Sequence, residues 1–143
     1  RLDHYLRNVA LREASRRHAA TLVLSPADDP GKVLGYYTLM PLRFVLMTME
    51  MRGVLISHLA VDRRERHRGH GSRLLRSALL RGIGRPAMAV AGIVAEAPEP
   101  GMFAFYRRYG FREMADYRHR LFQFPRAVRA SADTVFGQVL EDD

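Results

Sequence analysis

Cysteine is absent from this chain of 143 residues, and lysine is almost absent, because Lys32 is the only one. Without cysteine the protein has no disulfide, no thiolate metal site and no cysteine nucleophile. No apolar run approaches the roughly 20 residues that span a bilayer, and no signal peptide opens the chain. We therefore expect a cytoplasmic protein with no membrane partner and predict no metal site.

The charge of the chain is strongly one-sided. Its formal net charge at pH 7 is +8, from 23 Lys and Arg against 15 Asp and Glu. Nearly all of the cations are arginine, which suits bidentate phosphate contacts and stacking. Such an excess indicates polyanionic partners, whether nucleic acid, an anionic cofactor or an acidic protein. A genomic base composition that favours arginine codons would explain the excess equally well, so both explanations stay open.

The length suits one domain with one core, and without any repeat or linker we predict a single domain over residues 1–143. Apolar periodicity predicts helices over residues 2–19, 71–82 and 101–109, with a short helix in the tail from 126 to 143. Strands are predicted at 21–24, 33–40, 44–47, 54–61, 88–95, 111–114 and 119–124, while 47–52 fits helix and strand equally. This order predicts a mixed α/β layer with helices on both faces of a sheet.

The most informative stretch runs from Arg66 to Gly71, between an apolar strand and an amphipathic helix whose apolar positions are 74, 75, 78 and 79. A turn into a helix N-terminus gathers unpaired backbone N–H groups and the positive end of the helix dipole. Glycines at 69 and 71 allow a diphosphate to approach the backbone, and arginines at 64, 66, 68 and 73 raise the local potential. The pattern predicts a phosphate-binding turn. The alternative is an ordinary connection with a solvated arginine cluster.

The spacing fits neither a dinucleotide-binding fingerprint nor a P-loop. An Arg-x-x-Gly-x-Gly turn directly after Leu59-Ala60-Val61-Asp62 resembles the coenzyme A pyrophosphate loop of the GNAT superfamily of N-acetyltransferases. A downstream Phe105-Tyr106 to Gly110-Phe111 follows in the superfamily's order. The resemblance implies acetyl-CoA as acetyl donor and an α/β (α+β) GNAT fold. In that fold a mostly antiparallel sheet has two central parallel strands, here 54–61 and 88–95, that splay apart around the pantetheine arm.

The same resemblance assigns the residues that would hold coenzyme A. Leu59, Ala60 and Val61 would pair through their backbone with the pantetheine amides, as an added strand does at a sheet edge. The diphosphate would lie on the turn formed by Arg66, His67, Arg68, Gly69, His70, Gly71 and Ser72.

Acetyl transfer from a thioester to an amine also needs a proton for the departing thiolate. By the resemblance Tyr106 is the catalytic tyrosine, because the matching residue points at the coenzyme sulfur and a phenol with a pKa near 10 is protonated at neutral pH. Tyr106 could instead only pack against the sheet, and Tyr109 would replace it if the helix register differs. For a general base His58 and Glu96 are both candidates. A base is not required for an α-amino group, whose pKa lies near 7.7–8.0.

A narrower resemblance covers most of the chain. It is carried by Leu2-Asp3-His4-Tyr5-Leu6, by the strand from Leu34 to Leu39, by Leu59 to Asp62, by Phe105 to Phe111 and by Leu121 to Pro125. These segments look like the GNAT toxins of toxin–antitoxin modules, which acetylate the α-amino group of aminoacyl-tRNA and stop translation. The resemblance implies that surface arginines, among them Arg12, Arg16, Arg17, Arg73, Arg76 and Arg81, bind tRNA. It also implies an antitoxin protein as partner, and it leaves a homodimer open.

Three features depart from that family. The chain opens inside what would be the first helix, so we expect a preceding N-terminal strand to be missing. The segment from Met40 to Ile56 lacks the Pro-rich insert often found there, and Glu99 replaces an asparagine near the coenzyme. One rival hypothesis is a GNAT enzyme that acetylates a small amine or a protein N-terminus, although few acids are expected near the reacting centre. The other is a non-catalytic nucleic-acid-binding module.

Overall fold

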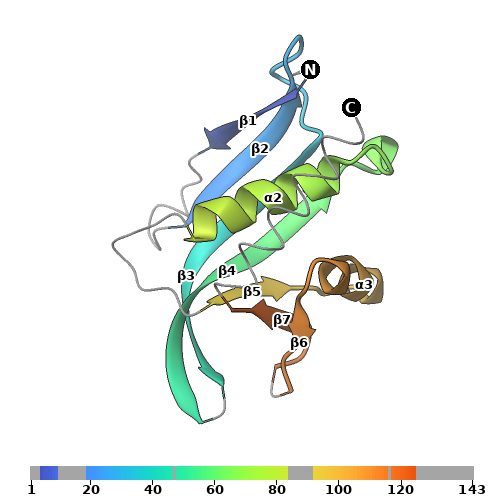
Figure 1. Cartoon of the computed structure of the whole chain (residues 1–143). Helices are drawn as coiled ribbons and strands as arrows, with labels where there is room; N and C mark the ends of the chain where they lie inside the picture. The colour runs from blue at the N-terminus through green and yellow to red at the C-terminus, as the bar shows by residue number, and fades with distance from the viewer. Residues whose placement is uncertain (1–3, 10–18, 47, 84–91, 116, 125–143) are drawn as a thin grey trace.

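The computed structural model describes residues 4–9, 19–46, 48–83, 92–115 and 117–124. Within these residues seven strands form one sheet in the order β1-β2-β3-β4-β5-β7-β6. The strands are β1 (His4–Val9), β2 (Ala20–Pro26), β3 (Gly35–Leu46), β4 (Met49–Val61), β5 (Gly92–Glu96), β6 (Arg112–Glu113) and β7 (Arg120–Gln123). The helices are a short 3₁₀ helix η1 (Arg63–Glu65), α2 (His70–Ile83) and α3 (Pro100–Arg108) (Figure 1).

The predicted pair of parallel strands is formed by β4 and β5, and every other neighbouring pair in the sheet is antiparallel. The parallel register joins Gly53 to Gly92 and ends where Ile56 meets Ala95. Because β4 runs on to Val61 without this partner, the two strands separate at their carboxyl ends. The splayed pair is therefore confirmed, although residues 88–91 of the predicted strand lie outside the described residues.

A β-bulge lies where the strands separate. Thr38 of β3 pairs with His58 of β4, but the next residue, Leu39, pairs with Ile56, so Ser57 is an extra residue on β4. A bulge re-aims the side chains that follow it and increases the local twist of the strand. The bulge thus turns the end of β4 away from β5 and sets which face each residue from His58 to Val61 presents.

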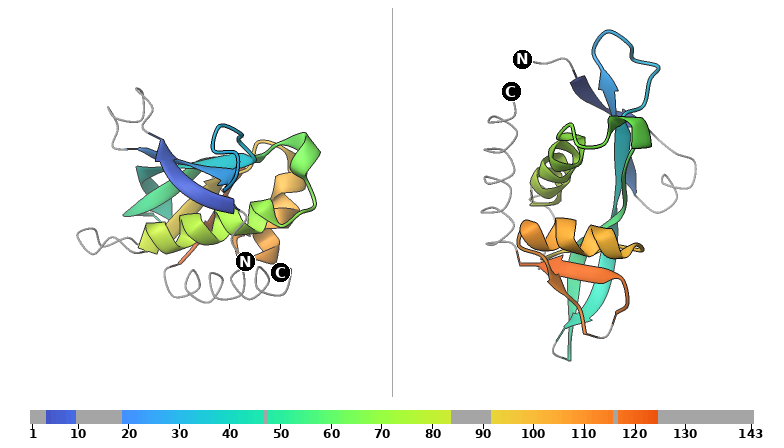
Figure 2. Two further views of the ribbon diagram at one scale, coloured as in Figure 1. Left: turned by 90° about the horizontal axis from the view of Figure 1, so that it is seen from above. Right: turned by 90° about the vertical axis from the view of Figure 1, so that its right-hand side faces the viewer.

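The amphipathic pattern of α2 is confirmed, since Leu74, Leu75, Ala78 and Leu79 are all fully buried. They pack against every second residue of the central strands, which lie on one face of the sheet and include Val54 and Ile56 of β4 and Ile93 and Ala95 of β5. Helix α3 adds Tyr106 and Tyr109 to the same core. The two described helices therefore cover one face of the sheet rather than both, as a view from the side also indicates (Figure 2). The prediction of helices on both faces is not met within the described residues.

The opposite face of the sheet carries a second cluster. Its buried members are Phe44, Leu55, Val94 and Met114, and the partly buried side chains of Met40, Leu42, Met51, Tyr117 and Phe122 pack against them. Leu55 and Val94 each lie between two residues of the first core in the sequence. Their side chains point to the opposite face because successive residues of a strand alternate between the two faces. The sheet is thus apolar on both faces, which explains the near-continuous apolar runs in β4 and β5.

The helix predicted for the first residues is wrong where the structure describes them. Residues 4–9 form β1, which pairs antiparallel with β2 from His4↔Pro26 to Val9↔Thr21. Helical spacing over so short a window does not exclude a strand, and pairing with β2 satisfies the backbone groups of an extended chain. The domain bounds and the expectation of a missing N-terminal strand stay predictions. Arg12, Arg16 and Arg17 lie outside the described residues.

Strand pairing also determines the secondary structure of the segment after Leu46, which fits helix and strand equally by sequence. Met49 to Val61 form one long strand, and Thr48 adopts a positive φ of 65° in the turn that joins it to β3. The predicted strands at 33–40 and 44–47 are accordingly parts of one strand, β3, with Met47 outside the described residues. The helix predicted in the tail from 126 to 143 lies outside them as well.

Candidate active site

The predicted phosphate turn begins at the end of β4. Asp62 accepts a hydrogen bond from the amide of Arg64 at 3.0 Å and so caps η1. The chain then passes through His67 and Gly69, with positive φ angles of 65° and 80°, before α2 starts. Glycine adopts a positive φ at the least steric cost, which explains the glycine at position 69.

Helix α2 begins directly after this turn. The amide of Arg73 donates a hydrogen bond of 3.1 Å to the carbonyl of Gly69. The backbone amides in the first turn of a helix point beyond its N-terminus, which here is the glycine turn. The first turn of α2 has no acidic residue that would compete for them. Gly71 has room beside it, because a Cβ there would lie 3.5 Å from the ring of Phe105. The turn has the geometry and potential of an anion site.

A buried carboxylate that the sequence pattern did not single out lies beneath this turn. Glu65 Oε1 lies 3.3 Å from Nη1 of Arg68 and 3.6 Å from Nε2 of His70, and Glu65 Oε2 lies 3.6 Å from Nζ of Lys32. The Glu65 side chain is 12% exposed. The side chains of Arg68 and His70 therefore face Glu65 and stabilise the turn from within. A single glutamate before a glycine turn does not indicate in the sequence that its side chain is buried beneath the turn.

A cavity of about 290 Å³ lies between the end of β4 and the segment that links β5 to α3. It brings together four residues predicted to contact coenzyme A, namely Leu59, Ala60, Val61 and Arg66. The remaining lining residues are Tyr36, Ser57, His58, Glu96, Pro98, Glu99 and Met102. The splay of the parallel strands thus opens a cavity directly beside the phosphate turn.

Both candidate bases line this cavity. His58 is exposed, and its Nδ1 lies 3.1 Å from Oγ of Ser57 in the bulge. Glu96 Oε1 accepts a hydrogen bond from Arg120 at 3.2 Å, while Glu99 extends the acidic wall. The expectation of few acids near the centre is wrong, because the loop after β5 folds back and brings both carboxylates to one cavity.

Tyr106 projects from near the C-terminal end of α3 into the core and is fully buried. Its ring makes edge contacts with Phe105 and Phe111 at centroid distances of 5.3 and 5.2 Å. Burial raises the pKa of the phenol above its ordinary value, so the hydroxyl stays protonated at neutral pH. This hydroxyl has no hydrogen-bond partner among the described residues. A buried hydroxyl without a partner costs about 1–3 kcal/mol, which a functional role would explain.

Tyr109 has a different environment. Its hydroxyl shares a hydrogen bond of 2.8 Å with Ser72 Oγ, in the first turn of α2, and its carbonyl accepts one of 2.6 Å from Gln123. The same phenol ring lies edge-on to Phe105 at 5.4 Å. Because its hydroxyl is already engaged with α2, Tyr109 serves as a link between the two helices and is a weaker candidate than Tyr106 for the proton donor.

Comparison with known protein families decides the class of enzyme. The family profile described as an acetyltransferase (GNAT) domain matches residues 17–113, from before β2 to β6. The chain belongs to the GNAT acetyltransferase family. The protein is therefore an acetyl-CoA-dependent N-acetyltransferase, and the hypothesis of a non-catalytic binding module is set aside. Among curated proteins no sequence matches the chain.

Solved structures share the fold of this GNAT protein at low sequence identity. The toxin AtaT complexed with acetyl-methionyl-tRNAfMet has a TM-score of 0.79 at 17% identity, covering 90% of this chain and 98% of that one. AtaTR bound with AcCoA has a TM-score of 0.77 at 19% identity, with coverage of 90% and 97%. The KacTA–DNA complex has a TM-score of 0.75 at 23% identity, covering 98% of this chain and 99% of that one.

Neither described helix of the GNAT domain has the length and apolar character that a bilayer crossing requires. Within the described residues no group of His, Asp or Glu is arranged to hold a metal ion.

Proposed function

We propose that this GNAT enzyme transfers the acetyl group of acetyl-CoA to the α-amino group of an aminoacyl-tRNA and thereby acts as a translation-blocking toxin. The observation that carries the proposal is the cavity at the splayed strands, where the phosphate turn, Leu59–Val61 and the candidate bases meet. The shared fold with a toxin solved together with acetyl-methionyl-tRNAfMet supports this acceptor. The net charge of +8 agrees with a polyanionic substrate.

The donor fits the residues at the turn. The amides of His70, Gly71 and Ser72 would hold the diphosphate, with the Arg66 side chain at the cavity wall, while Arg68 supports the turn through Glu65. The backbone of Leu59, Ala60 and Val61 is free of a β5 partner and would pair with the pantetheine amides. Bound in this way, acetyl-CoA supplies the reactive thioester.

Tyr106 is the proton donor in this proposal. The amine attacks the thioester carbonyl, an N–C bond forms and the C–S bond breaks, and the phenol proton of Tyr106 passes to the departing sulfur. The raised pKa of the buried phenol keeps that proton available at neutral pH. The unpartnered hydroxyl would gain its missing partner from the sulfur.

The attacking amine must be neutral. An α-amino group with a pKa near 7.7–8.0 is partly neutral at pH 7, so solvent or His58 can accept the proton released on attack. A lysine side chain, with a pKa near 10.4, would need a far stronger base. The exposed position of His58 suits a relay to solvent rather than a deeply buried base.

A small cationic amine is the second candidate acceptor, and one observation favours it. Glu96 and Glu99 both line the cavity, and carboxylates there would attract an ammonium group. Arg120 offsets the charge of Glu96 at 3.2 Å, which leaves Glu99 as the carboxylate that would select such a substrate.

An in vitro transfer assay tests the proposal. The protein is incubated with labelled acetyl-CoA and either charged tRNA or a panel of small amines, and mass spectrometry examines the tRNA 3′ end. We expect an N-acetylated aminoacyl adenosine with the wild type and much less with Tyr106→Phe. Efficient acetylation of a small amine with unmodified tRNA would instead select the second candidate.

The partners follow from the same proposal. A toxin of this kind needs an antitoxin, as the structure of an AtaT mutant with the C-terminus of the antitoxin AtaR illustrates for that protein. We include an antitoxin protein and a homodimer in the proposal. Expression in a bacterial host should arrest translation, and co-expression of the matching antitoxin should relieve that arrest.

A further inference from the structure

Strands β3 and β4 extend beyond the rest of the sheet. Strand β2 pairs with β3 only from Gly35 to Leu39, and β5 pairs with β4 only from Gly53 onward. Residues 43–46 of β3 and 49–52 of β4 therefore pair with each other and with no further strand among the described residues. We call this projecting two-stranded ribbon the hairpin extension (Figure 1). A two-stranded ribbon is marginally stable alone, so its length requires a physical explanation.

One face of the hairpin extension is braced by the domain. Phe44, which is 2% exposed, packs in the second cluster against Val94 and Met114. The amide of Val45 donates a hydrogen bond of 3.4 Å to the hydroxyl of Tyr117. The apolar face thus holds the extension in a defined position against the domain. The side chains of the opposite face point away from this cluster.

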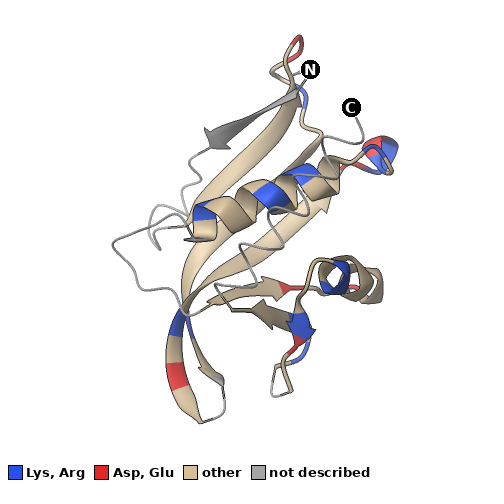
Figure 3. Ribbon diagram, viewed as in Figure 1, with Lys and Arg blue, Asp and Glu red and all other residues tan. Residues whose placement is uncertain are grey.

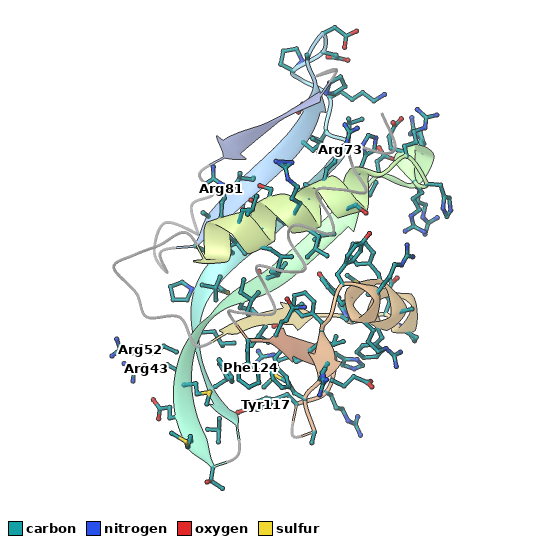
Figure 4. All side chains as sticks on the ribbon, in the orientation of Figure 1. Arg43, Arg52, Arg73, Arg81, Tyr117 and Phe124 are labelled. Atoms are coloured by element: carbon teal, nitrogen blue, oxygen red, sulfur yellow. The ribbon has the colours of Figure 1, made fainter. Side chains whose placement is uncertain are left out.

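The other face carries two arginines directly opposite each other. Arg43 of β3 pairs in register with Arg52 of β4, so both side chains leave the ribbon on the same side (Figure 4). Like charges at directly opposed positions destabilise a strand pair. Arg43 lies 3.6 Å from Glu50 in an ion pair whose side chains are 69% and 66% exposed, and such exposed pairs contribute little. The side chain of Arg52 makes no ion pair or hydrogen bond with the described residues.

A second pocket lies directly at these two arginines. It measures about 290 Å³ and is lined by Pro41, Leu42, Arg43, Arg52 and Gly53. None of these residues lines the cavity beside the phosphate turn. Two guanidinium groups beside an apolar pocket suit a phosphate flanked by a sugar or base, since arginine binds phosphate bidentately and stacks on planar groups.

We infer that Arg43 and Arg52 form a phosphate-backbone contact for the RNA acceptor, away from the site where acetyl is transferred. The inference rests on the proposed function for the identity of the RNA. Helix α2, which covers the same face of the sheet as the two arginines, also carries basic residues along its length (Figure 3). An elongated polyanion could thus contact several elements, which a small amine could not. The braced hairpin extension holds the two arginines in fixed positions. A phosphate bound between them would offset the repulsion of two like charges at opposed positions.

The test uses the full chain with both arginines neutralised, Arg43→Gln with Arg52→Gln. Both positions are exposed, so the variant should fold. The matched control is Arg112→Gln with Arg118→Gln, which removes the same charge from exposed positions at and near β6, an edge strand of the sheet. Affinity for uncharged total tRNA is measured over a series of salt concentrations. A poly-glutamate peptide serves as a second probe.

We expect the Arg43/Arg52 variant to bind tRNA at least fivefold more weakly. The slope of log affinity against log salt should fall by roughly 0.7–0.9 for each lost contact. Its KM for aminoacyl-tRNA should rise, while its kcat with a minimal acceptor, an aminoacyl adenosine, should stay at the wild-type level. Glu50→Gln frees Arg43 and should tighten tRNA binding. The control pair should change the salt slope by less than the Arg43/Arg52 pair.

Unchanged tRNA affinity and salt slope in the Arg43/Arg52 variant would overturn the inference. Loss of poly-glutamate binding alone would also overturn it and indicate an acidic protein as the occupant. The proposed function fails separately: if the wild type does not acetylate charged tRNA, the acceptor is wrong, yet the arginine pair can still be judged from uncharged tRNA.

Discussion

The phenol oxygen of Tyr109 lies 2.8 Å from the hydroxyl oxygen of Ser72, so the end of the helix that carries Tyr106 is bonded to the first turn of the helix at the phosphate turn. Phe105 strengthens this connection, because its ring lies beside Gly71 in the same turn. A residue that contacts both helices can transmit the position of one to the other. We therefore expect Tyr109 to act as a positioning residue that couples cofactor binding at the turn to the placement of Tyr106.

Tyr109→Phe should weaken acetyl-CoA binding in addition to lowering stability. Tyr37→Phe is the matched control, since Tyr37 shares a hydrogen bond of 2.7 Å with Ser77 on the same helix, farther from the turn. Loss of either hydrogen bond should cost about 0.5–1.5 kcal/mol in the free energy of unfolding. Only Tyr109→Phe should raise the Kd for acetyl-CoA in calorimetry. An equal effect of both variants on Kd would refute the positioning role.

Gly69→Val should weaken acetyl-CoA binding at least tenfold, or about 1.4 kcal/mol. The φ angle of 80° at Gly69 is a conformation that a β-branched residue adopts only under strain, so the turn must change shape. Gly101→Ala is the control, because a Cβ at that position meets nothing within 4 Å. Equilibrium binding and thermal unfolding measured on both variants separate the turn's geometry from global stability. A folded Gly69→Val protein with wild-type affinity would remove the turn from the cofactor site.

Tyr106→Phe should abolish most activity without destabilising the protein. The hydroxyl is buried without a described partner, so its removal relieves a desolvation cost, and the free energy of unfolding should stay equal or rise. The acetylation rate should fall by roughly 10²-fold, the scale of a lost proton donor, while the Kd for acetyl-CoA is preserved. Single-turnover kinetics and urea unfolding measure the two effects. If turnover stays at the wild-type rate, the thiolate receives its proton from another group.

Stability should fall at alkaline pH because of the same residue. Burial raises the pKa of Tyr106 in the folded state, whereas in the unfolded chain the phenol titrates near 10. Below about pH 10 the phenol is protonated in both states and does not affect the pH dependence of stability. As the pH rises from there toward the folded-state pKa, only the unfolded chain loses the proton, so the free energy of unfolding falls. Tyr106→Phe should show a smaller loss of unfolding free energy between about pH 9 and 11. Parallel alkaline profiles of the two proteins would contradict this account.

Local patterns determined much of the active half of the molecule. The apolar positions 74, 75, 78 and 79 predict α2, and the two glycines between an apolar strand and that helix predict the turn. Both signals are short-range, because helix periodicity and a positive φ depend on neighbouring residues only. The position of Tyr106 on a helix that ends just before Gly110 is predictable for the same reason.

The tertiary structure decided features that depend on distant residues. Residues 4–9 are a strand because β2 supplies their hydrogen-bond partners, although their spacing is helical. Glu65 is held by Lys32 from the turn between two other strands, and Glu99 reaches the cavity only through the path of the chain after β5. The opposition of Arg43 and Arg52 depends on the register of a long hairpin. Burial, pairing and register are set by the whole fold, so the sequence determined the kind of site, and packing determined which side chains meet in it.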